Sequence, residues 1–240
     1  MRLAAPFVSA LLALAFALPA AAQDLERVKA DLKKKFPDAQ IDGVRKSGYG
    51  GLLEVNGAGE VFYTDEKTSF LLLGTLIDTK SRENVTEARV RKLTAVSFDS
   101  LPLADSVKIV RGNGSRRIAI FEDPNCGYCK RFEQELASVH DITVHVFLYP
   151  ILSPDSTEKS KAIWCAPDRG KAWMDLMLRN ASPAGEAKCD TPIDKVLAWG
   201  KDKRISGTPT IFFEDGERVP GAMPLAQFEK RLADAKLAKK

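Results

Sequence analysis

Two cysteines, Cys126 and Cys129, lie between an apolar run and an amphipathic run, and this arrangement constrains the chain more than any other feature. The apolar residues 118–121 predict a buried strand, and residues 130–136 predict a helix with its apolar side chains on one face. The two thiols are therefore expected at a strand-to-helix junction, with Cys126 close to the N-terminus of the helix. Free backbone N–H groups and the positive end of the helix dipole stabilise a thiolate at such a position.

The expected position of Cys126 predicts an acidic thiol. A cysteine has an ordinary pKa of about 8.5, and a helix N-terminus lowers that pKa to between about 3.5 and 7.5. A thiol that is ionised at neutral pH is a nucleophile. We therefore predict that Cys126 attacks disulfides and that Cys129, one helical turn inward, is the resolving thiol.

The N-terminal residues 1–22 predict a cleaved signal peptide. Arg2 gives a charged start, residues 3–18 are apolar, and Ala20 and Ala22 supply the small side chains of a cleavage site. The apolar run is shorter than the about 20 residues that a membrane span needs. The mature chain is therefore expected to be soluble and exported.

Export determines how the four cysteines are interpreted, because disulfides form in oxidising compartments and are rare in the cytosol. Four cysteines permit three pairings. Local geometry favours the pairing in which Cys126 faces Cys129 across a helical turn, which leaves Cys165 to pair with Cys189. We interpret the first pair as redox-active and the second as structural, with a stabilising effect of about 3–4 kcal/mol.

The same cysteine spacing also occurs in zinc sites, which need four ligands. The chain has two histidines, His140 and His145, and His145 alternates within an apolar strand, so we interpret it as a structural residue. No metal and no cofactor are predicted. The net charge of +4 is small and aromatic residues are not interleaved with the basic ones, so nucleic-acid binding is not predicted either.

Residues 23–83 predict a small α+β domain. It begins with an amphipathic helix at residues 24–36, which ends at Pro37. An antiparallel meander of three or more strands is expected to follow, at residues 52–55, 60–64 and 69–77. A domain of this size is marginally stable alone, and an exposed apolar edge strand commonly pairs with a partner. Pairing of this edge strand with the same strand of a second copy, which forms a dimer, is one way to cover it.

Residues 84–103 predict a linker, and residues 104–240 predict an α/β domain. The linker begins with a polar helical pattern at residues 84–96. In the α/β domain, strands at residues 107–110 and 118–121 are expected to form a hairpin. The later strands and helices are expected at residues 142–148, 156–164, 171–178, 193–199, 210–213 and 225–233. This order is that of a thioredoxin-like layout with a helical insertion.

A second chemical signal is the dipeptide Thr208-Pro209, which lies directly before an apolar strand. A proline at the start of a strand commonly marks a tight turn and nothing more. In a chain with a Cys-x-x-Cys sequence and this layout, it suggests a cis peptide bond that places the loop against the Cys126 sulfur. The backbone of Thr208 is then free to pair with an extended substrate as a short added strand.

The sequence resembles the periplasmic disulfide isomerases of the DsbC type over essentially the whole mature chain. Gly127 and Tyr128, between the two cysteines, are specific to this group. The other residues that carry the resemblance are Phe121, Asp123, residues 161–166, Cys189-Asp190, Gly207-Thr208-Pro209, Val219-Pro220-Gly221 and Asn84-Val85-Thr86.

The resemblance implies an N-terminal cystatin-like dimerisation domain, a linker helix and a C-terminal thioredoxin-fold catalytic domain. Two copies are expected to form a V whose uncharged cleft holds misfolded exported proteins with wrong disulfides. A membrane thiol reductase of the DsbD type is the implied partner that keeps the enzyme reduced.

The resemblance also implies roles for individual residues. Cys126 is the attacking thiol and Cys129 the resolving thiol. Pro209 is the cis-proline, and Cys165 and Cys189 form the structural bridge. The residues that adjoin the two thiols are expected to modulate their reactivity: Gly127, Tyr128, Thr208 and Pro209.

The chain departs from the family pattern at two places near the cysteines. Pro124 and Asn125 stand where relatives often carry Ile or Val and Thr, so the local reduction potential is expected to differ. Position 120, where thioredoxin has a buried acid, is Ile120. Glu122 or water is therefore the expected proton acceptor.

The leading hypothesis is a periplasmic disulfide isomerase that forms a mixed disulfide through Cys126. A dedicated thiol oxidase is a second hypothesis, which the expected dimerisation domain argues against. A third is a holdase chaperone or thiol protector of the DsbG type, with a narrow range of clients and a cleft that does most of the binding.

Overall fold

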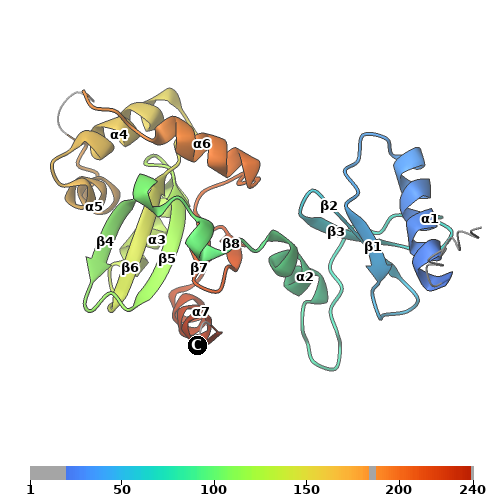
Figure 1. Ribbon diagram of the computed structural model, residues 1–240. Helices are drawn as coiled ribbons and strands as arrows, with labels where there is room; N and C mark the ends of the chain where they lie inside the picture. Colours follow the sequence, from blue (N-terminus) through green and yellow to red (C-terminus); the bar gives the residue numbers. More distant parts are fainter. Residues whose placement is uncertain (1–19, 184–187, 239–240) are drawn as a thin grey trace, which may run out of the picture. The chain divides into compact units, whose positions relative to one another are not determined.

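A computed structural model describes residues 20–183 and 188–238 and divides the chain into two units, Met1–Val90 and Arg91–Lys240 (Figure 1). Residues 1–19 of the predicted signal peptide lie outside the described residues. No helix in the described part of the chain is long and apolar enough to cross a membrane.

The N-terminal unit is one helix on a three-stranded antiparallel sheet of order β1-β2-β3. The elements are α1 (Ala20–Lys35), β1 (Gly43–Lys46), β2 (Leu53–Gly57) and β3 (Glu60–Thr64). Val28 and Leu32, one helical turn apart, pack against Leu53 and Val55 of the central strand. The amphipathic period therefore places the helix on the sheet, as the sequence predicts.

The strand predicted at residues 69–77 is not formed. This segment makes two isolated bridges, Tyr63 with Leu72 and Ile77 with Asn84, and the third strand of the sheet is β1, which the apolar pattern does not reveal. The Asp65 carboxylate accepts a hydrogen bond from the backbone N–H of Ser69 at 2.8 Å and fixes a turn that returns the chain to β3, where Leu72 makes the single bridge with Tyr63. The segment leaves four large apolar side chains exposed: Phe70, Leu72, Leu73 and Ile77.

The linker helix is α2 (Val85–Thr94), and the boundary between the two units falls inside it. None of its side chains is buried. Its first turn is capped by Asn84, whose side-chain oxygen accepts a hydrogen bond from the Glu87 backbone N–H at 2.9 Å. Caps and ion pairs, such as Arg89 with Glu54 at 2.7 Å, stabilise this helix in place of apolar packing.

The C-terminal unit is a five-stranded sheet of order β4-β6-β5-β7-β8, with helices on its two faces (Figure 1). β5 and β6 are parallel and the other pairs are antiparallel. The strands are β4 (Val107–Arg111), β5 (Arg116–Glu122), β6 (Ile142–Leu148), β7 (Thr210–Phe213) and β8 (Arg218–Pro220). The helices are α3 (Gly127–Leu136), α4 (Pro154–Cys165), α5 (Arg169–Arg179), α6 (Ile193–Asp202) and α7 (Leu225–Ala238), with short 3-10 turns η1 (Phe98–Ser100) and η2 (Leu103–Asp105).

The predicted hairpin between residues 107–110 and 118–121 is wrong, because β6 lies between β4 and β5 in the sheet. The short connection after β4 passes over the start of β6. There the backbone N–H of Asn113 donates to the Asp141 carboxylate at 2.9 Å, and the Thr143 hydroxyl donates to the Gly114 carbonyl at 2.9 Å. A tight turn between two strands is thus compatible with a third strand inserted between them.

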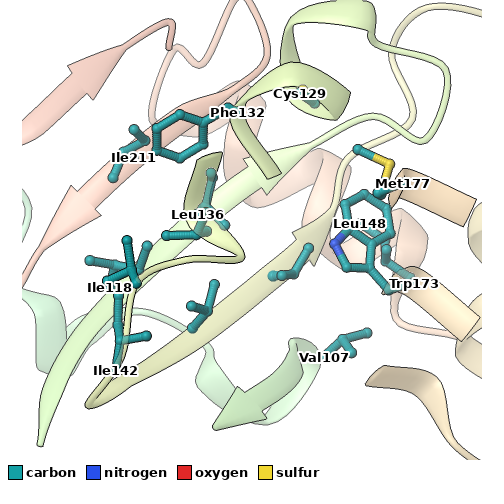
Figure 2. Packing of buried hydrophobic residues seen from close by; sticks show 14 of the residues in the cluster. Val107, Ile118, Cys129, Phe132, Leu136, Ile142, Leu148, Trp173, Met177 and Ile211 are labelled. Atoms are coloured by element: carbon teal, nitrogen blue, oxygen red, sulfur yellow. The ribbon is translucent and has the colours of Figure 1, made fainter. Parts of the chain in front are cut away.

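β5 is apolar at every position from 118 to 121 because both faces of the sheet are covered. Ile118 and Ile120 join the larger apolar cluster, which includes Phe132 and Leu136 of α3 (Figure 2). Ala119 and Phe121 point to the opposite face and join a second cluster. Burial on both faces explains the uninterrupted apolar run. The strand therefore delivers its C-terminal end, and the cysteines that follow, from a rigid core.

The packing of the N-terminal unit predicts an unequal effect of two glycine substitutions. A Cβ atom on Gly57 would lie 1.7 Å from the backbone carbonyl oxygen of Gln40, whereas on Gly74 the nearest atom is the Leu72 Cδ2 at 3.7 Å. We expect Gly57→Ala to lower the free energy of unfolding of this unit by about 1–3 kcal/mol and Gly74→Ala to leave it nearly unchanged. Urea denaturation followed by circular dichroism measures both, and equal midpoints would contradict this packing.

Candidate active site

Cys126 is the N-cap residue of α3, at the end of the turn that follows β5. Its sulfur accepts a hydrogen bond from the backbone N–H of Cys129 at 3.2 Å. This bond uses one of the free N–H groups of the first helical turn. The predicted nucleophile therefore lies at the positive end of the helix, with Cys129 on the first turn and completely buried.

The loop around Pro209 brings a distant segment of the chain against the Cys126 sulfur. The peptide bond between Thr208 and Pro209 is cis. The Cys126 sulfur lies 3.3 Å from the Thr208 carbonyl oxygen, which accepts a hydrogen bond from Cys126 when this residue is protonated. The residues predicted from sequence at 126, 129, 208 and 209 thus meet at one place in the structure.

The two thiols have opposite electrostatic environments. The pKa of Cys126 is lowered to about 5, mainly through its hydrogen bond with the Cys129 side chain and further through Thr208 and the backbone N–H groups of Cys129 and Tyr128. Burial raises the pKa of the Cys129 thiol, and the Cys126 hydrogen bond and the charge of Glu122 raise it further. At neutral pH, Cys126 is therefore a thiolate and Cys129 a neutral thiol.

The buried carboxylate of Asp123 fixes the turn that precedes Cys126. It accepts hydrogen bonds from the Asn125 backbone N–H at 2.8 Å, the Ser156 hydroxyl at 2.7 Å and the Leu152 backbone N–H at 2.9 Å. These partners come from the turn itself, from α4 and from the loop before α4. Sequence reasoning used Asp123 only as part of the resemblance and did not identify this positioning role, since the partners lie far along the chain.

The Asn125 side chain extends the same network. Its amide donates to the Asp155 carboxylate at 2.7 Å and to the Ser156 hydroxyl at 3.0 Å, and its oxygen accepts from Lys159 at 2.8 Å. Asn125 therefore ties the residue directly before Cys126 to the first turns of α4. Asn125 is one of the residues at which the chain departs from the family pattern, and these hydrogen bonds are the structural consequence of that departure.

The surface beside Cys126 is apolar and accessible. Tyr128 is 64% exposed, with the Arg131 guanidinium 4.6 Å from its ring centre. Ile151 and Leu152, in the loop that hydrogen-bonds Asp123, are 39% and 56% exposed and line an open pocket with Pro150. A second pocket, of about 160 Å³, lies along the 204–210 loop and includes Thr208 and Pro209.

Two carboxyl groups lie in the protein interior near Cys129. Glu122, the last residue of β5, and Glu133, on α3, are both completely buried. Burial first, and then the charge of Glu133, raise the pKa of Glu122 well above its usual range. Sequence reasoning named Glu122 as a candidate proton acceptor and missed Glu133, whose place in a helical pattern suggests a solvated residue.

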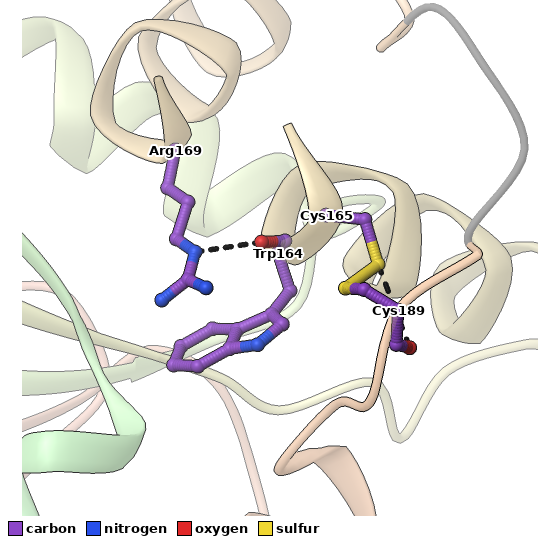
Figure 3. Close-up of a disulfide and its surroundings, with 4 residues drawn as sticks. All are labelled: Trp164, Cys165, Arg169 and Cys189. Atoms are coloured by element: carbon purple, nitrogen blue, oxygen red, sulfur yellow. Dashed lines mark hydrogen bonds between the residues drawn. A yellow bond between two sulfur atoms is a disulfide. The ribbon is translucent and has the colours of Figure 1, made fainter. Parts of the chain in front are cut away.

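The other two cysteines form a disulfide between Cys165, at the end of α4, and Cys189, with an S–S distance of 2.07 Å (Figure 3). Next to it, the Arg169 guanidinium stacks 3.8 Å from the Trp164 ring centre and donates to the Trp164 carbonyl at 2.6 Å. The bridge and this stacking hold the helical insertion together at one end of α4.

His145 is a buried residue of the sheet and has a structural role. Its Nδ1 lies 2.9 Å from the Ser106 hydroxyl, and the residue is buried in β6, as predicted. Burial, with smaller effects of Lys108 and Arg117, lowers the pKa of His145 to about 4. Among the described residues, no three His, Cys, Asp or Glu side chains gather closely enough to hold a metal ion.

Comparison with known protein families finds a match to each unit. Residues 17–87 match the model of the disulfide bond isomerase protein N-terminal domain, and residues 103–236 match that of the thioredoxin-like domain. The predicted thioredoxin-like fold of the C-terminal unit is therefore confirmed. The N-terminal unit is likewise confirmed as a domain of the kind that precedes it in the DsbC proteins.

Individual relatives agree with these matches. The probable thiol:disulfide interchange protein DsbC of Bordetella pertussis (strain Tohama I) is 47% identical over 207 residues, which cover 86% of this chain and 74% of that protein. The thiol:disulfide interchange protein DsbC of Escherichia coli (strain K12) is 35% identical over 120 residues, about half of each chain. The crystal structure of a disulfide interchange protein from Neisseria gonorrhoeae, 38% identical, superposes on 57% of this chain and 99% of its own with a TM-score of 0.55.

The site electrostatics predict a large difference in reactivity between the two thiols. We expect iodoacetamide to alkylate Cys126 with a rate that rises through a midpoint near pH 5, because its pKa is lowered to about 5, and to leave the buried Cys129 unmodified. Mass spectrometry of the reduced protein as a function of pH measures this. Cys126→Ala is the control, and a midpoint near the ordinary value of about 8.5 would refute the assigned environment.

Proposed function

Because the chain belongs to the DsbC family of thiol:disulfide interchange proteins, we propose that it is an isomerase that rearranges non-native disulfides in exported proteins. The observation that carries this proposal is the pairing of an acidic thiol, Cys126, with a neutral and buried one, Cys129. The first supplies the nucleophile, and the second is held back until a mixed disulfide exists.

The proposed reaction begins when the Cys126 thiolate attacks one sulfur of a wrong disulfide. A bond forms between Cys126 and that sulfur, the substrate disulfide breaks, and the other substrate sulfur leaves as a thiolate. A second substrate thiolate then attacks the mixed disulfide, forms a new pairing and releases Cys126 with no net oxidation. Alternatively, Cys129 attacks Cys126, which leaves the enzyme oxidised and the substrate reduced by two electrons.

The second outcome requires a source of electrons. A dithiol donor must reduce the Cys126–Cys129 disulfide before the next cycle, and a membrane thiol reductase of the DsbD type is the proposed donor. The proposed site of the reaction is the periplasm, to which the predicted signal peptide would direct the chain.

The surface around Cys126 supports binding of unfolded segments. The exposed side chains of Tyr128, Ile151 and Leu152 offer apolar contact, and the backbone of Thr208 offers hydrogen bonds to an extended chain. Folded proteins bury the apolar side chains that such a surface binds. We infer chaperone-like binding of misfolded clients on the same basis, which keeps a DsbG-like holdase as the second candidate function.

A second copy of the chain is the proposed partner of the N-terminal unit. Phe70, Leu72, Leu73 and Ile77 are exposed within one short segment, and Leu73 is 80% exposed. A contiguous apolar segment on a small domain is an expected protein–protein contact. A homodimer formed here would place two catalytic units in one molecule.

The isomerase proposal predicts different effects of the two cysteine substitutions. We expect Cys126→Ala to abolish reactivation of scrambled ribonuclease in a glutathione buffer, because no mixed disulfide forms. Cys129→Ala should retain part of the activity, since substrate thiols can resolve the mixed disulfide. Unchanged reactivation by Cys126→Ala would disprove the proposal, and suppression of aggregation that survives loss of both thiols would favour the holdase function.

The dimer proposal predicts that charge on the exposed segment separates the copies. Light scattering after size-exclusion chromatography should give the mass of a dimer for the unaltered protein and of a monomer for Leu73→Asp. Leu237→Asp, at another exposed leucine on α7 (68%), is the matched control and should remain dimeric. A monomeric unaltered protein would exclude the dimer.

A further inference from the structure

The pocket of about 160 Å³ beside Thr208 has a positively charged lining. Two arginines, Arg204 and Arg218, contribute to it, and among the described residues that line it none is acidic. The Thr208 carbonyl oxygen, in the same lining, lies 3.3 Å from the Cys126 sulfur. The charged pocket therefore adjoins the attacking atom.

Arg218 carries a half-buried charge that lacks a carboxylate partner. It lies on β8, and its Nη1 donates a hydrogen bond to the Lys203 carbonyl oxygen at 2.6 Å. The nearest carboxylates along the chain, Asp215 and Glu217, pair with Arg231 instead. Within the part of the chain that the structure describes, no carboxylate forms an ion pair with Arg218, and burial lowers the pKa of its guanidinium.

The chemistry of this side chain selects the ligand. A guanidinium has five N–H donors in a planar fork that matches the two oxygens of a carboxylate. Arg218 uses one donor on the protein itself, which leaves donors for a group in the pocket that it lines. A charge taken from water without a counter-charge costs free energy. A carboxylate that enters the pocket would remove this cost.

The size and the lining of the pocket suit one side chain. Small-molecule sites have volumes of about 300–1,000 Å³, so a pocket of about 160 Å³ holds an aspartate or glutamate side chain and little more. Its lining is held in place by hydrogen bonds. The Thr210 hydroxyl donates to the Gly207 carbonyl at 2.8 Å, and the Gly221 backbone N–H donates to the Pro209 carbonyl at 2.7 Å. A site formed in advance loses less conformational entropy on binding.

We propose that this pocket binds an acidic side chain of the client, close in sequence to the cysteine that Cys126 attacks. The inference rests on the proposed function and adds a substrate preference to it. A client segment that pairs with the Thr208 backbone as an extended strand advances about 3.3 Å per residue. A side chain one or two residues from the client cysteine therefore reaches the pocket, where Arg218 binds it.

The pocket also offsets a repulsion that the reaction creates. Cys126 attacks as a thiolate, because its pKa is lowered to about 5. A negative sulfur repels a client segment that carries negative charge nearby. A guanidinium next to the attacking sulfur counteracts this repulsion, so that acidic segments are accepted as clients.

The test measures attack by Cys126 on pairs of peptides that differ in one charge. Each peptide has one cysteine linked by a disulfide to uncharged 2-thiopyridine, with glutamate or glutamine one or two residues before or after that cysteine. In the reduced protein, Cys126 attacks the peptide sulfur, the disulfide breaks, and the pyridine sulfur leaves, takes up a proton and absorbs as pyridine-2-thione. Each rate is divided by the rate with 2-mercaptoethanol, which removes the intrinsic effect of the charge.

We expect a glutamate peptide to react about 10-fold faster than its glutamine counterpart, the effect of one charge-assisted hydrogen bond. An ionic strength of about 0.15 M suppresses long-range steering. In Arg218→Gln, which keeps an N–H donor for Lys203, the two peptides should react equally fast. Arg179→Gln removes the same charge from an exposed position at the end of α5 and is the matched control, which should keep the preference. Equal rates at every position in the unaltered protein, or a preference that survives Arg218→Gln, overturn the proposal.

Ser206→Asp tests the pocket without altering Arg218, and it gives the answer if Arg218→Gln folds poorly. Ser206 is exposed and lines the pocket. An aspartate there supplies the carboxylate from the protein itself, so the preference for glutamate should disappear. Ser206→Asn, which has the same size and no charge, should retain the preference. A preference that is unchanged in Ser206→Asp contradicts the proposal.

Failure of the proposed function gives a different result. A protein that is not an isomerase would not reactivate scrambled ribonuclease, whereas the preference among peptides depends only on the attack by Cys126 and would still be measured. Reactivation without any preference would refute the acidic site and leave the proposed function standing.

Discussion

The buried Asp123 carboxylate is the interaction on which the site depends. Its three hydrogen bonds join the end of β5, the loop before α4 and α4 itself. Loss of these donors would destabilise the protein, because buried oxygen atoms of Asp123 would remain without hydrogen-bond partners. The turn after β5 therefore has one conformation, and that conformation sets Cys126 at the first N–H groups of α3. Strand, turn and helix act as one rigid support for a single sulfur.

The two thiols differ because one helical turn separates two environments. Cys126 lies at the N-cap, where hydrogen bonds and the helix dipole favour the anion, and Cys129 lies in the apolar core, where burial favours the neutral form. The buried Glu122 carboxyl group raises the pKa of the Cys129 thiol further. The spacing of two residues between cysteines is thus sufficient to separate the nucleophile from the resolving thiol. The chemistry follows from position along the helix rather than from different side chains.

The sequence was enough to predict the two thiols, the Pro209 loop and most of the C-terminal elements, because each has a local signal. β6 is predicted with its observed bounds, since six of its seven residues are apolar or β-branched and turn residues stand on either side. The errors concern long-range pairing. Insertion of β6 between β4 and β5 depends on contacts across the sheet, and the segment 69–77 has strand composition but leaves β3 after one bridge. The partners of Asp123 and Glu133 were also beyond prediction, because they come from distant elements.

The position of Cys165 has a consequence for how the molecule tolerates a reductant. A disulfide is reduced more readily when its reduced form is stabilised as a thiolate. Reduction of a Cys126–Cys129 disulfide returns Cys126, with a pKa of about 5, whereas Cys165 is the last residue of α4, where the negative end of the dipole disfavours an anion. A mild dithiol is thus expected to reduce a disulfide at the N-terminus of α3 and to leave the disulfide at the C-terminus of α4 closed. Helix polarity alone gives thermodynamic selectivity between two disulfides of one chain, and the scaffold stays cross-linked while the Cys126–Cys129 pair cycles.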